Sequence, residues 1–173
     1  MLVDYKKVNS KIEFLSYPMP TIEHAFKQFS GAVVFSVLDF ISAYFQVPCI
    51  PRSRRAFCTP FGLFEFNRLP MRISVVSKGL TRVIDELFAD LKGNFVFSYL
   101  DDLIVYSRLV QERATHVMVV LQRPENAHFT LNLDTFVIGA AAIKYLGHSL
   151  FSRGISMLTN RVAAIKAYPR IRM

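Results

Sequence analysis

Two adjacent acids, Asp101 and Asp102, are the residues of this chain best suited to chemistry. They separate two short runs rich in β-branched and aromatic residues, Asn94–Tyr99 and Leu103–Ser107, which predict two strands joined by a tight turn. Carboxylates about 4 Å apart repel by roughly 4 kcal/mol at an effective dielectric of about 20. A divalent cation cancels that charge, and Mg²⁺ takes carboxylate oxygens while leaving positions for phosphates. Taken alone, however, an Asp-Asp turn is usually just solvated, because Asp is a common turn residue.

A third acid shifts the interpretation from a solvated turn towards a metal site. Asp39 ends the apolar run Ala32–Asp39, and an Asp at the end of a buried strand costs free energy unless it is paired or metal-bound. If this strand lies beside the Asp101-Asp102 hairpin, three carboxylates converge at one edge of a sheet. A two-metal phosphoryl-transfer site has this geometry, with ions about 3.5–4 Å apart that stabilise the attacking and leaving oxygens.

The elements expected around these acids alternate between helices and strands. Apolar spacing predicts helices over Ile22–Phe29, Ser77–Leu91 and Val110–Arg123, the last ended by Pro124, and a short helical or irregular bend over Ser42–Val47. The further expected strands are Val33–Asp39, Phe129–Leu133, Phe136–Ile138 and Ile143–Leu150, with a second hairpin of Ala56–Thr59 and Leu63–Asn67. Helices packed on one face of an antiparallel sheet make an α+β domain.

The composition fits a single basic, intracellular domain. The chain has 173 residues, enough for a real core, and its net charge of +8 suits a polyanionic partner or a merely basic protein. Hydrophobic residues make up 52%, which indicates either surface covered by further segments or a partner, or a large aromatic core built on 16 Phe. The longest uncharged apolar run, Phe136–Ile143, is too short to span a bilayer, and no signal peptide is seen. Cys49 and Cys58 lack metal-ligand spacing, which predicts buried reduced thiols and a cytoplasmic or nuclear location.

Seven motifs in the right order and spacing make the chain resemble a known family. They are Val3–Asn9, Tyr17–Pro20, Phe35–Phe40, Ala56–Phe66, Tyr99–Asp102, Tyr145–His148, and Ser152–Ile155 with Ala164-Ile165. The sequence resembles the reverse transcriptase domain of long-terminal-repeat retroelements, most closely the gypsy type. The resemblance implies a reverse-transcriptase-like palm with partial fingers in a single domain, 1–173. Fingers would cover about 1–30 and 48–72, palm about 31–47 and 73–155, and the start of the thumb connection 156–173.

The resemblance implies a catalytic and metal-binding role for the three acids. Asp39, Asp101 and Asp102 would hold two Mg²⁺ ions, with Mn²⁺ as an alternative, and the Phe40 backbone carbonyl would help. The implied activity is that of an RNA-directed DNA polymerase, which adds deoxynucleoside triphosphates to a DNA primer on an RNA template. Thumb and RNase H segments would come from a larger polyprotein, and no membrane is involved.

The resemblance also implies substrate and primer contacts. Tyr44 would lie under the incoming sugar and exclude a 2′-hydroxyl, and Gln46 and Arg54 would belong to the same substrate site. The strand turn of Tyr145, Leu146, Gly147 and His148 would grip the primer end. Without the family, Tyr44 is equally well an ordinary core aromatic, and Arg54 is a solvated charge.

Departures from the family pattern predict weakened chemistry. Arg72 stands where the family has a glycine turn, and Val76-Ser77 replace an Ala-Pro pair. Near Asp134-Thr135 the family has a lysine that would assist the pyrophosphate leaving group. Its loss predicts slow chemistry or none. The alternative function is therefore a catalytically dead relic that binds nucleic acid or another protein.

Overall fold

The structure, a computed structural model, describes residues 4–12, 17–18, 21–48, 56–71, 73 and 76–157. The helices are α1 (Lys6–Asn9), α2 (Ile22–Gln28), α3 (Ala43–Gln46), α4 (Val76–Leu87) and α5 (Arg113–Asn126), with 3₁₀ turns η2 (Val110–Glu112) and η3 (Leu133–Thr135). The strands are β1 (Val34–Asp39), β2 (Ala56–Thr59), β3 (Gly62–Glu65), β4 (Val96–Tyr99), β5 (Asp102–Ser107), β6 (Val137–Ala140), β7 (Ala142–Tyr145), β8 (His148–Phe151) and β9 (Gly154–Met157).

A four-stranded antiparallel sheet with the order β4-β5-β1-β6 forms the centre of the molecule. β1 lies between two neighbours, which accounts for its almost unbroken apolar sequence: Val34, Phe35 and Leu38 are buried. The buried hydroxyl of Ser36 accepts a hydrogen bond from the Gly139 amide at 3.1 Å. Strand β1 therefore reaches its last residue, Asp39, as a rigid central element.

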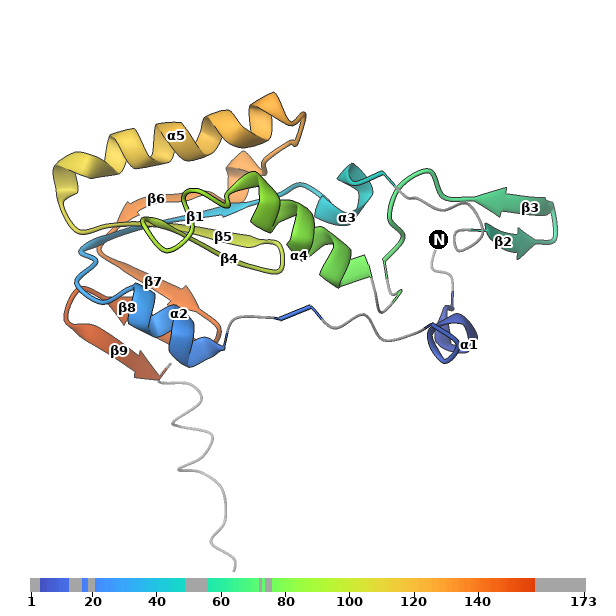
Figure 1. Ribbon diagram of the computed structural model, residues 1–173, viewed down its shortest axis with the longest axis horizontal. Coiled ribbons are helices and arrows are strands. Elements are labelled where there is room, and N and C mark those ends of the chain that lie inside the picture. Colours follow the sequence, from blue (N-terminus) through green and yellow to red (C-terminus); the bar gives the residue numbers. More distant parts are fainter. Residues whose placement is uncertain are drawn as a thin grey trace, which may run out of the picture.

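A hydrophobic core covers each face of this sheet. On one face, Leu80 of α4 and Val120 of α5 pack with Leu38. On the other, Phe29 from the end of α2 and Tyr145 of β7 belong to the cluster that contains the aromatic side chains of the sheet. Figure 1 shows α5 above the sheet, and α2 with β7, β8 and β9 below it. The sheet is thus covered on both faces, whereas the sequence predicted helices on one.

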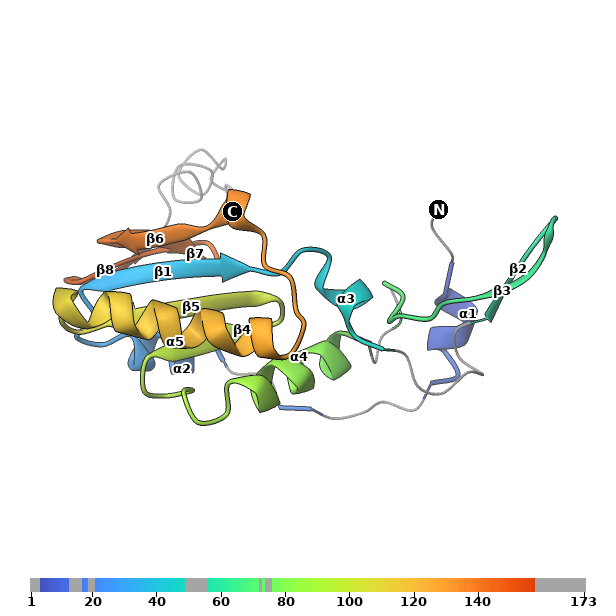
Figure 2. The ribbon, with the colours of Figure 1, turned by 90° about the horizontal axis from the view of Figure 1, so that it is seen from above.

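The strands near the carboxyl end form a separate antiparallel sheet, β7-β8-β9. The expected strand Ile143–Leu150 is in fact β7 and β8 joined by a tight turn. The predicted hairpin near residue 60 is confirmed as β2 and β3, which project away from the central sheet (Figure 2). Its tip exposes Phe61, which is 92% accessible, and Leu63, which is 72% accessible. The high hydrophobic content therefore serves both a large aromatic core and an apolar hairpin surface.

Two predicted elements differ from the structure. Pro124 does not end the last long helix, because α5 continues to Asn126 and buries the proline on the same side as Val117 and Val120. Burial of the ring offsets the missing N–H bond. The expected strand over residues 129–133 is an isolated bridge at Leu131 followed by η3.

Two smaller expectations concern the thiols and the membrane. Cys58 is exposed rather than buried, because it lies on the exposed side of strand β2, and Cys49 lies outside the described residues. Across the described ranges, no helix has both the length and the apolar character needed to cross a bilayer.

Candidate functional site

Asp39 and Asp102 lie directly opposite each other at one end of the central sheet. Asp39 is the last residue of β1 and Asp102 the first of β5, and the antiparallel register pairs them. Directly opposed side chains leave the same face of a sheet with Cβ atoms about 4.5–5.5 Å apart. Both side chains are only partly buried. Two carboxylates from positions far apart in sequence therefore share one partly open edge.

Asp101 is brought to the same edge by the turn between β4 and β5. Because Tyr99 pairs with Asp102, only Leu100 and Asp101 make the turn. Leu100 has φ +58°, a left-handed conformation that costs a residue with a Cβ about 1–3 kcal/mol. Positive φ at the first turn residue matches the twist of a two-residue hairpin. The predicted strand–turn–strand with the acids at its tip is confirmed.

Burial and two neighbouring charges act on Asp102. Burial raises the pKa of its carboxyl group, and the charges of Asp101 and Asp39 raise that pKa further. Within the described ranges, no three His, Cys, Asp or Glu side chains stand closely enough together to hold a metal ion as they are. The three acids nevertheless fit a divalent cation by donor type and by charge, because they offer hard oxygen ligands and repel one another.

The backbone carbonyl of Phe40 faces the acidic hairpin. After β1, Phe40 and Leu131 form an isolated antiparallel bridge, in which the Asn132 amide donates to the Asp39 carbonyl at 2.8 Å. Successive carbonyls of a strand point to opposite sides. The Phe40 carbonyl is therefore directed to the other side of β1, where β5 lies.

The turn predicted to contact a primer packs on the face that carries the acids. Tyr145 pairs with His148, so Leu146 and Gly147 form the turn, with φ +46° and +80° as a type I′ hairpin requires. Tyr145 is 4% exposed, and within the described part of the chain its hydroxyl has no hydrogen-bond partner. Burial raises the pKa of this phenol, and the charge of Asp102 raises it further. The turn is therefore close enough to the acids for their negative charges to act on the Tyr145 hydroxyl.

The two predicted substrate residues on α3 have different surroundings. The Tyr44 hydroxyl donates to Ser77 Oγ at the start of α4 at 3.2 Å. The Gln46 side-chain amide forms hydrogen bonds with the backbone amide and carbonyl of Thr130, 84 residues away. Sequence reasoning missed Ser77 and Thr130 as partners, because no local pattern indicates a contact across such a separation.

Other predicted positions fall partly outside the described ranges. Arg54 and the neighbouring Arg52 and Arg55 lie outside them, as does Arg72, the residue at the family's glycine position. Asp134 and Thr135, where the resemblance implies that a lysine has been lost, belong to η3, and the Thr135 hydroxyl donates to the Asn132 carbonyl at 3.1 Å.

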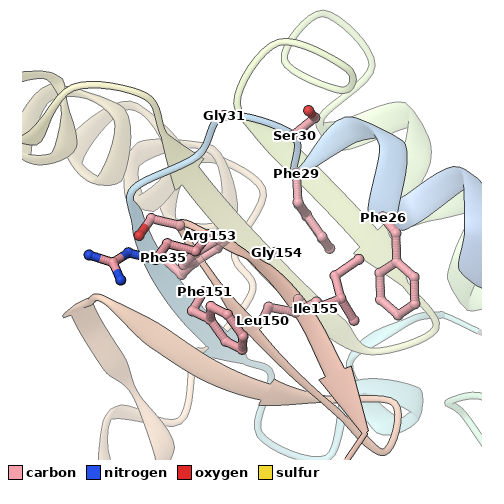
Figure 3. A pocket seen from close by; sticks show the side chains of 11 residues that line it. Phe26, Phe29, Ser30, Gly31, Phe35, Leu150, Phe151, Arg153, Gly154 and Ile155 are labelled. Atoms are coloured by element: carbon pink, nitrogen blue, oxygen red, sulfur yellow. The ribbon is translucent and has the colours of Figure 1, made fainter.

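A cavity of about 230 Å³ lies towards the other end of β1. Figure 3 shows Phe29, Phe35, Leu150 and Ile155 among the side chains that line it. Phe35 precedes Asp39 by four residues, about 13 Å along a strand at 3.3 Å per residue. The cavity is therefore separate from the acidic edge.

The sequence is similar to reverse transcriptases over most of its length. A family model described as reverse transcriptase (RNA-dependent DNA polymerase) matches residues 1–150. The Transposon Tf2-3 polyprotein of Schizosaccharomyces pombe is 30% identical over 158 residues, and the Tf2-7 polyprotein is 29% identical. The match covers 90% of this chain and 12% of each polyprotein, so the chain spans about an eighth of the length of these relatives.

Solved structures share the fold. The foamy viral protease-reverse transcriptase in complex with an RNA/DNA hybrid has a TM-score of 0.82 at 17% identity and covers 99% of this chain and 23% of its own. A form of it in complex with double-stranded DNA has a TM-score of 0.84 at 17% identity and covers 98% of this chain and 30% of its own. The predicted fold class, an α+β palm-like domain with partial fingers, is confirmed.

Proposed function

Because the chain belongs to the reverse transcriptase (RNA-dependent DNA polymerase) family, we propose that it is the polymerase palm, with partial fingers, of a retroelement polyprotein. It adds deoxynucleotides to a DNA primer on an RNA template. The observation that carries this proposal is the pairing of Asp39 with Asp102, with Asp101 in the adjoining turn. In this proposal the palm covers about 31–47 and 73–155, the fingers cover about 1–30 and 48–72, and 156–173 begin the thumb connection.

The three acids are the catalytic groups of this proposal. Asp39, Asp101 and Asp102 hold the divalent cations, and the Phe40 carbonyl, directed to the same side, adds a neutral oxygen ligand. Bound Mg²⁺ or Mn²⁺ supplies charge that stabilises the attacking and leaving oxygens of phosphoryl transfer. Without that charge, the carboxylates would repel a triphosphate.

Residues around the acids position the substrates. Tyr44 on α3 excludes a 2′-hydroxyl by its ring, and Arg54 meets the triphosphate. The turn from Tyr145 to His148 holds the primer end on the face of the sheet that carries Asp102.

Nucleic acid is the partner that the charge and the relatives support. The net charge of +8 favours polyanions, and the foamy viral relative is in complex with an RNA/DNA hybrid. The Tf2 relatives are polyproteins of which this chain matches 12%, which supports thumb and RNase H segments supplied by a longer protein.

The second candidate function is nucleic-acid binding without nucleotide addition. It is favoured by Asp134-Thr135, where the resemblance implies the loss of a lysine that would assist the leaving group; the Thr135 hydroxyl instead donates to the Asn132 carbonyl. A chain that binds a primer–template duplex but adds no nucleotide would have this function.

Primer extension separates the two candidates. The 173-residue chain is mixed with a labelled DNA primer on an RNA template, deoxynucleoside triphosphates and Mg²⁺ or Mn²⁺. We expect extension by the wild type and a rate about 10²–10³-fold lower for Asp101→Asn, since removing one group that stabilises transition-state charge costs about that much. Glu125→Gln, which removes an exposed acid on α5, is the matched control. Binding without extension by the wild type, at any concentration of either metal, would rule out the polymerase.

A further inference from the structure

Both the oxygen and the nitrogen of the Gln46 side-chain amide form hydrogen bonds with the main chain. Its Oε1 accepts a hydrogen bond from the Thr130 amide at 2.6 Å, and its Nε2 donates to the Thr130 carbonyl at 2.8 Å. Nε2 also donates to the Ile41 carbonyl. The amide therefore pairs with both polar backbone groups of one distant residue, as a neighbouring strand would.

This contact links α3 to two paired segments, one of which includes Asp39. The Ile41 amide donates to the Thr130 carbonyl at 3.1 Å, and the Asn132 amide donates to the Asp39 carbonyl at 2.8 Å. The stretch 39–41 is thereby paired with the stretch 130–132. Gln46 adds α3 to this pair of segments, so that the end of β1, the Thr130 segment and α3 are held together.

Helix α3 needs such a contact because it cannot hold itself in place. It has one turn, Ala43–Gln46, and its N-cap residue Ser42 is left-handed at φ 46°, ψ 49°, with no side-chain cap bond. A single turn fixes more backbone freedom than its hydrogen bonds recover. Arg68 donates to the Gln46 carbonyl at 2.9 Å, which anchors the main chain but leaves the side-chain contact independent.

Tyr44 is the residue whose position this contact sets. It lies in the middle of α3, and its hydroxyl donates to Ser77 on α4 at 3.2 Å. The Tyr44 ring is thus held at the backbone by α3 and at the hydroxyl by α4.

We infer that Gln46 is a positioning residue that fixes Tyr44 relative to Asp39, rather than a residue that contacts the nucleotide. The inference rests on the proposed polymerase function, in which the Tyr44 ring excludes ribose. It assigns part of the discrimination between deoxyribose and ribose to the Gln46 side chain. The amide of this side chain is already hydrogen-bonded to the backbone of Thr130 and Ile41.

Gln46→Glu tests this assignment with almost no change in shape. A carboxylate can still accept from the Thr130 amide, but its second oxygen would face the carbonyls of Thr130 and Ile41, which are acceptors. The contact should open at α3 while the core remains intact. Gln122→Glu makes the same chemical change at an exposed position of α5 and is the matched control.

Two readouts are measured on each variant of the full chain. The first is NMR: hydrogen exchange of the Thr130 amide and the proximity of the Tyr44 ring to Ser77. We expect Gln46→Glu to speed this exchange about tenfold, as expected for one hydrogen bond, and to weaken the ring contact. The second is the ratio of deoxyribonucleotide to ribonucleotide addition, which we expect to fall about tenfold. Gln122→Glu should change neither.

The outcomes separate this inference from the proposed function. If Gln46→Glu leaves the hydrogen exchange of the Thr130 amide and the proximity of the Tyr44 ring to Ser77 unchanged, the proposed role of the Gln46–Thr130 contact is overturned, whatever the activity. If the Gln46–Thr130 contact opens but the ratio of deoxyribonucleotide to ribonucleotide addition does not change, Gln46 contributes to folding alone and the positioning role is overturned. A wild-type chain with a protected Thr130 amide but no extension would contradict the polymerase function, and the positioning role with it, while leaving the hydrogen bonds themselves established.

Discussion

Asp39 and Asp102 are a cross-strand pair in a register whose other pairs are apolar except for two buried serines, Ser36 and Ser107. The pairs that precede it include Leu38 with Leu103 and Val37 with Ile104. Apolar pairs fix this register, since a slip of one residue would move every buried side chain to the other face. The hydrophobic core thus holds two like charges opposite each other, at an edge where a proton or a bound cation would relieve their repulsion.

Removing one of these charges should stabilise the metal-free chain. Like charges directly opposite on a sheet are destabilising, and cross-strand pairs are worth about 0.2–1 kcal/mol. We expect Asp102→Asn to raise the free energy of unfolding by an amount in this range, measured by urea denaturation in EDTA near pH 7. Glu125→Gln is the control for loss of one negative charge. A clear loss of stability in Asp102→Asn would mean that the carboxylates do not repel in the folded chain.

Alkaline pH should destabilise the chain through Tyr17. Burial, then the hydrogen bond that it donates to Asp85 Oδ2 at 2.7 Å and the negative charge of Asp85, together raise the pKa of this phenol to about 12. The folded state therefore keeps a proton that the unfolded state loses near its ordinary value of about 10. The contribution is fully present below pH 10 and is lost as pH rises from about 10 to 12.

The measurement is urea unfolding from pH 8 to 12 for the wild type and Tyr17→Phe. The variant should be less stable at pH 8, because it lacks the bond to Asp85, and its stability should fall less over the alkaline range. Parallel pH profiles for the two proteins would show that the Tyr17 proton is not linked to folding.

The core beside Asp39 should be sensitive to cavities. Leu38 is fully buried between the sheet, α4 and α5, and large-to-small changes at such positions cost about 2–5 kcal/mol. We expect Leu38→Ala to lose this much stability by urea denaturation, whereas Leu133→Ala, at a position 74% exposed, should stay within about 0.5 kcal/mol of the wild type. Equal effects at both positions would contradict the packing of β1.

Binding to a primer–template duplex should depend steeply on salt and not on the acids. Each phosphate neutralised contributes about −0.9 to the slope of log K against log salt for duplex DNA, and the chain carries a net charge of +8. We expect a slope of several units in fluorescence anisotropy, unchanged by Asp101→Asn without divalent metal. A slope near zero would argue against a phosphate-contacting groove.

The sequence predicted the acidic edge well because local signals determined it. Alternating apolar runs around Asp101-Asp102 and before Asp39 indicated strands, and pairing of buried strands then brought the acids together. The segment near Thr130 could not be predicted in the same way. The backbone groups of Thr130 are bound by the side chain of Gln46, 84 residues away, and the segment pairs with the end of β1 through a single bridge at Leu131.

Pro124 shows a second limit of local reasoning. A proline usually ends a helix, but here it faces the core on the same side as Val117 and Val120, and α5 continues to Asn126. The exposure of Cys58 has a similar origin, since among the described strands β2 pairs with β3 alone. In each case tertiary context, which no short window of sequence contains, decided the outcome.

The most direct test of the account is whether Asp39 and the hairpin acids bind the same cations. Mn²⁺ binding to the wild type, Asp39→Asn and Asp102→Asn is measured by electron paramagnetic resonance, with a primer–template duplex and a non-hydrolysable triphosphate present. We predict that the wild type binds Mn²⁺ at this site and that either substitution removes the same bound ions. Retention of those ions by Asp39→Asn, when Asp102→Asn has lost them, would show that the acids do not share a metal site.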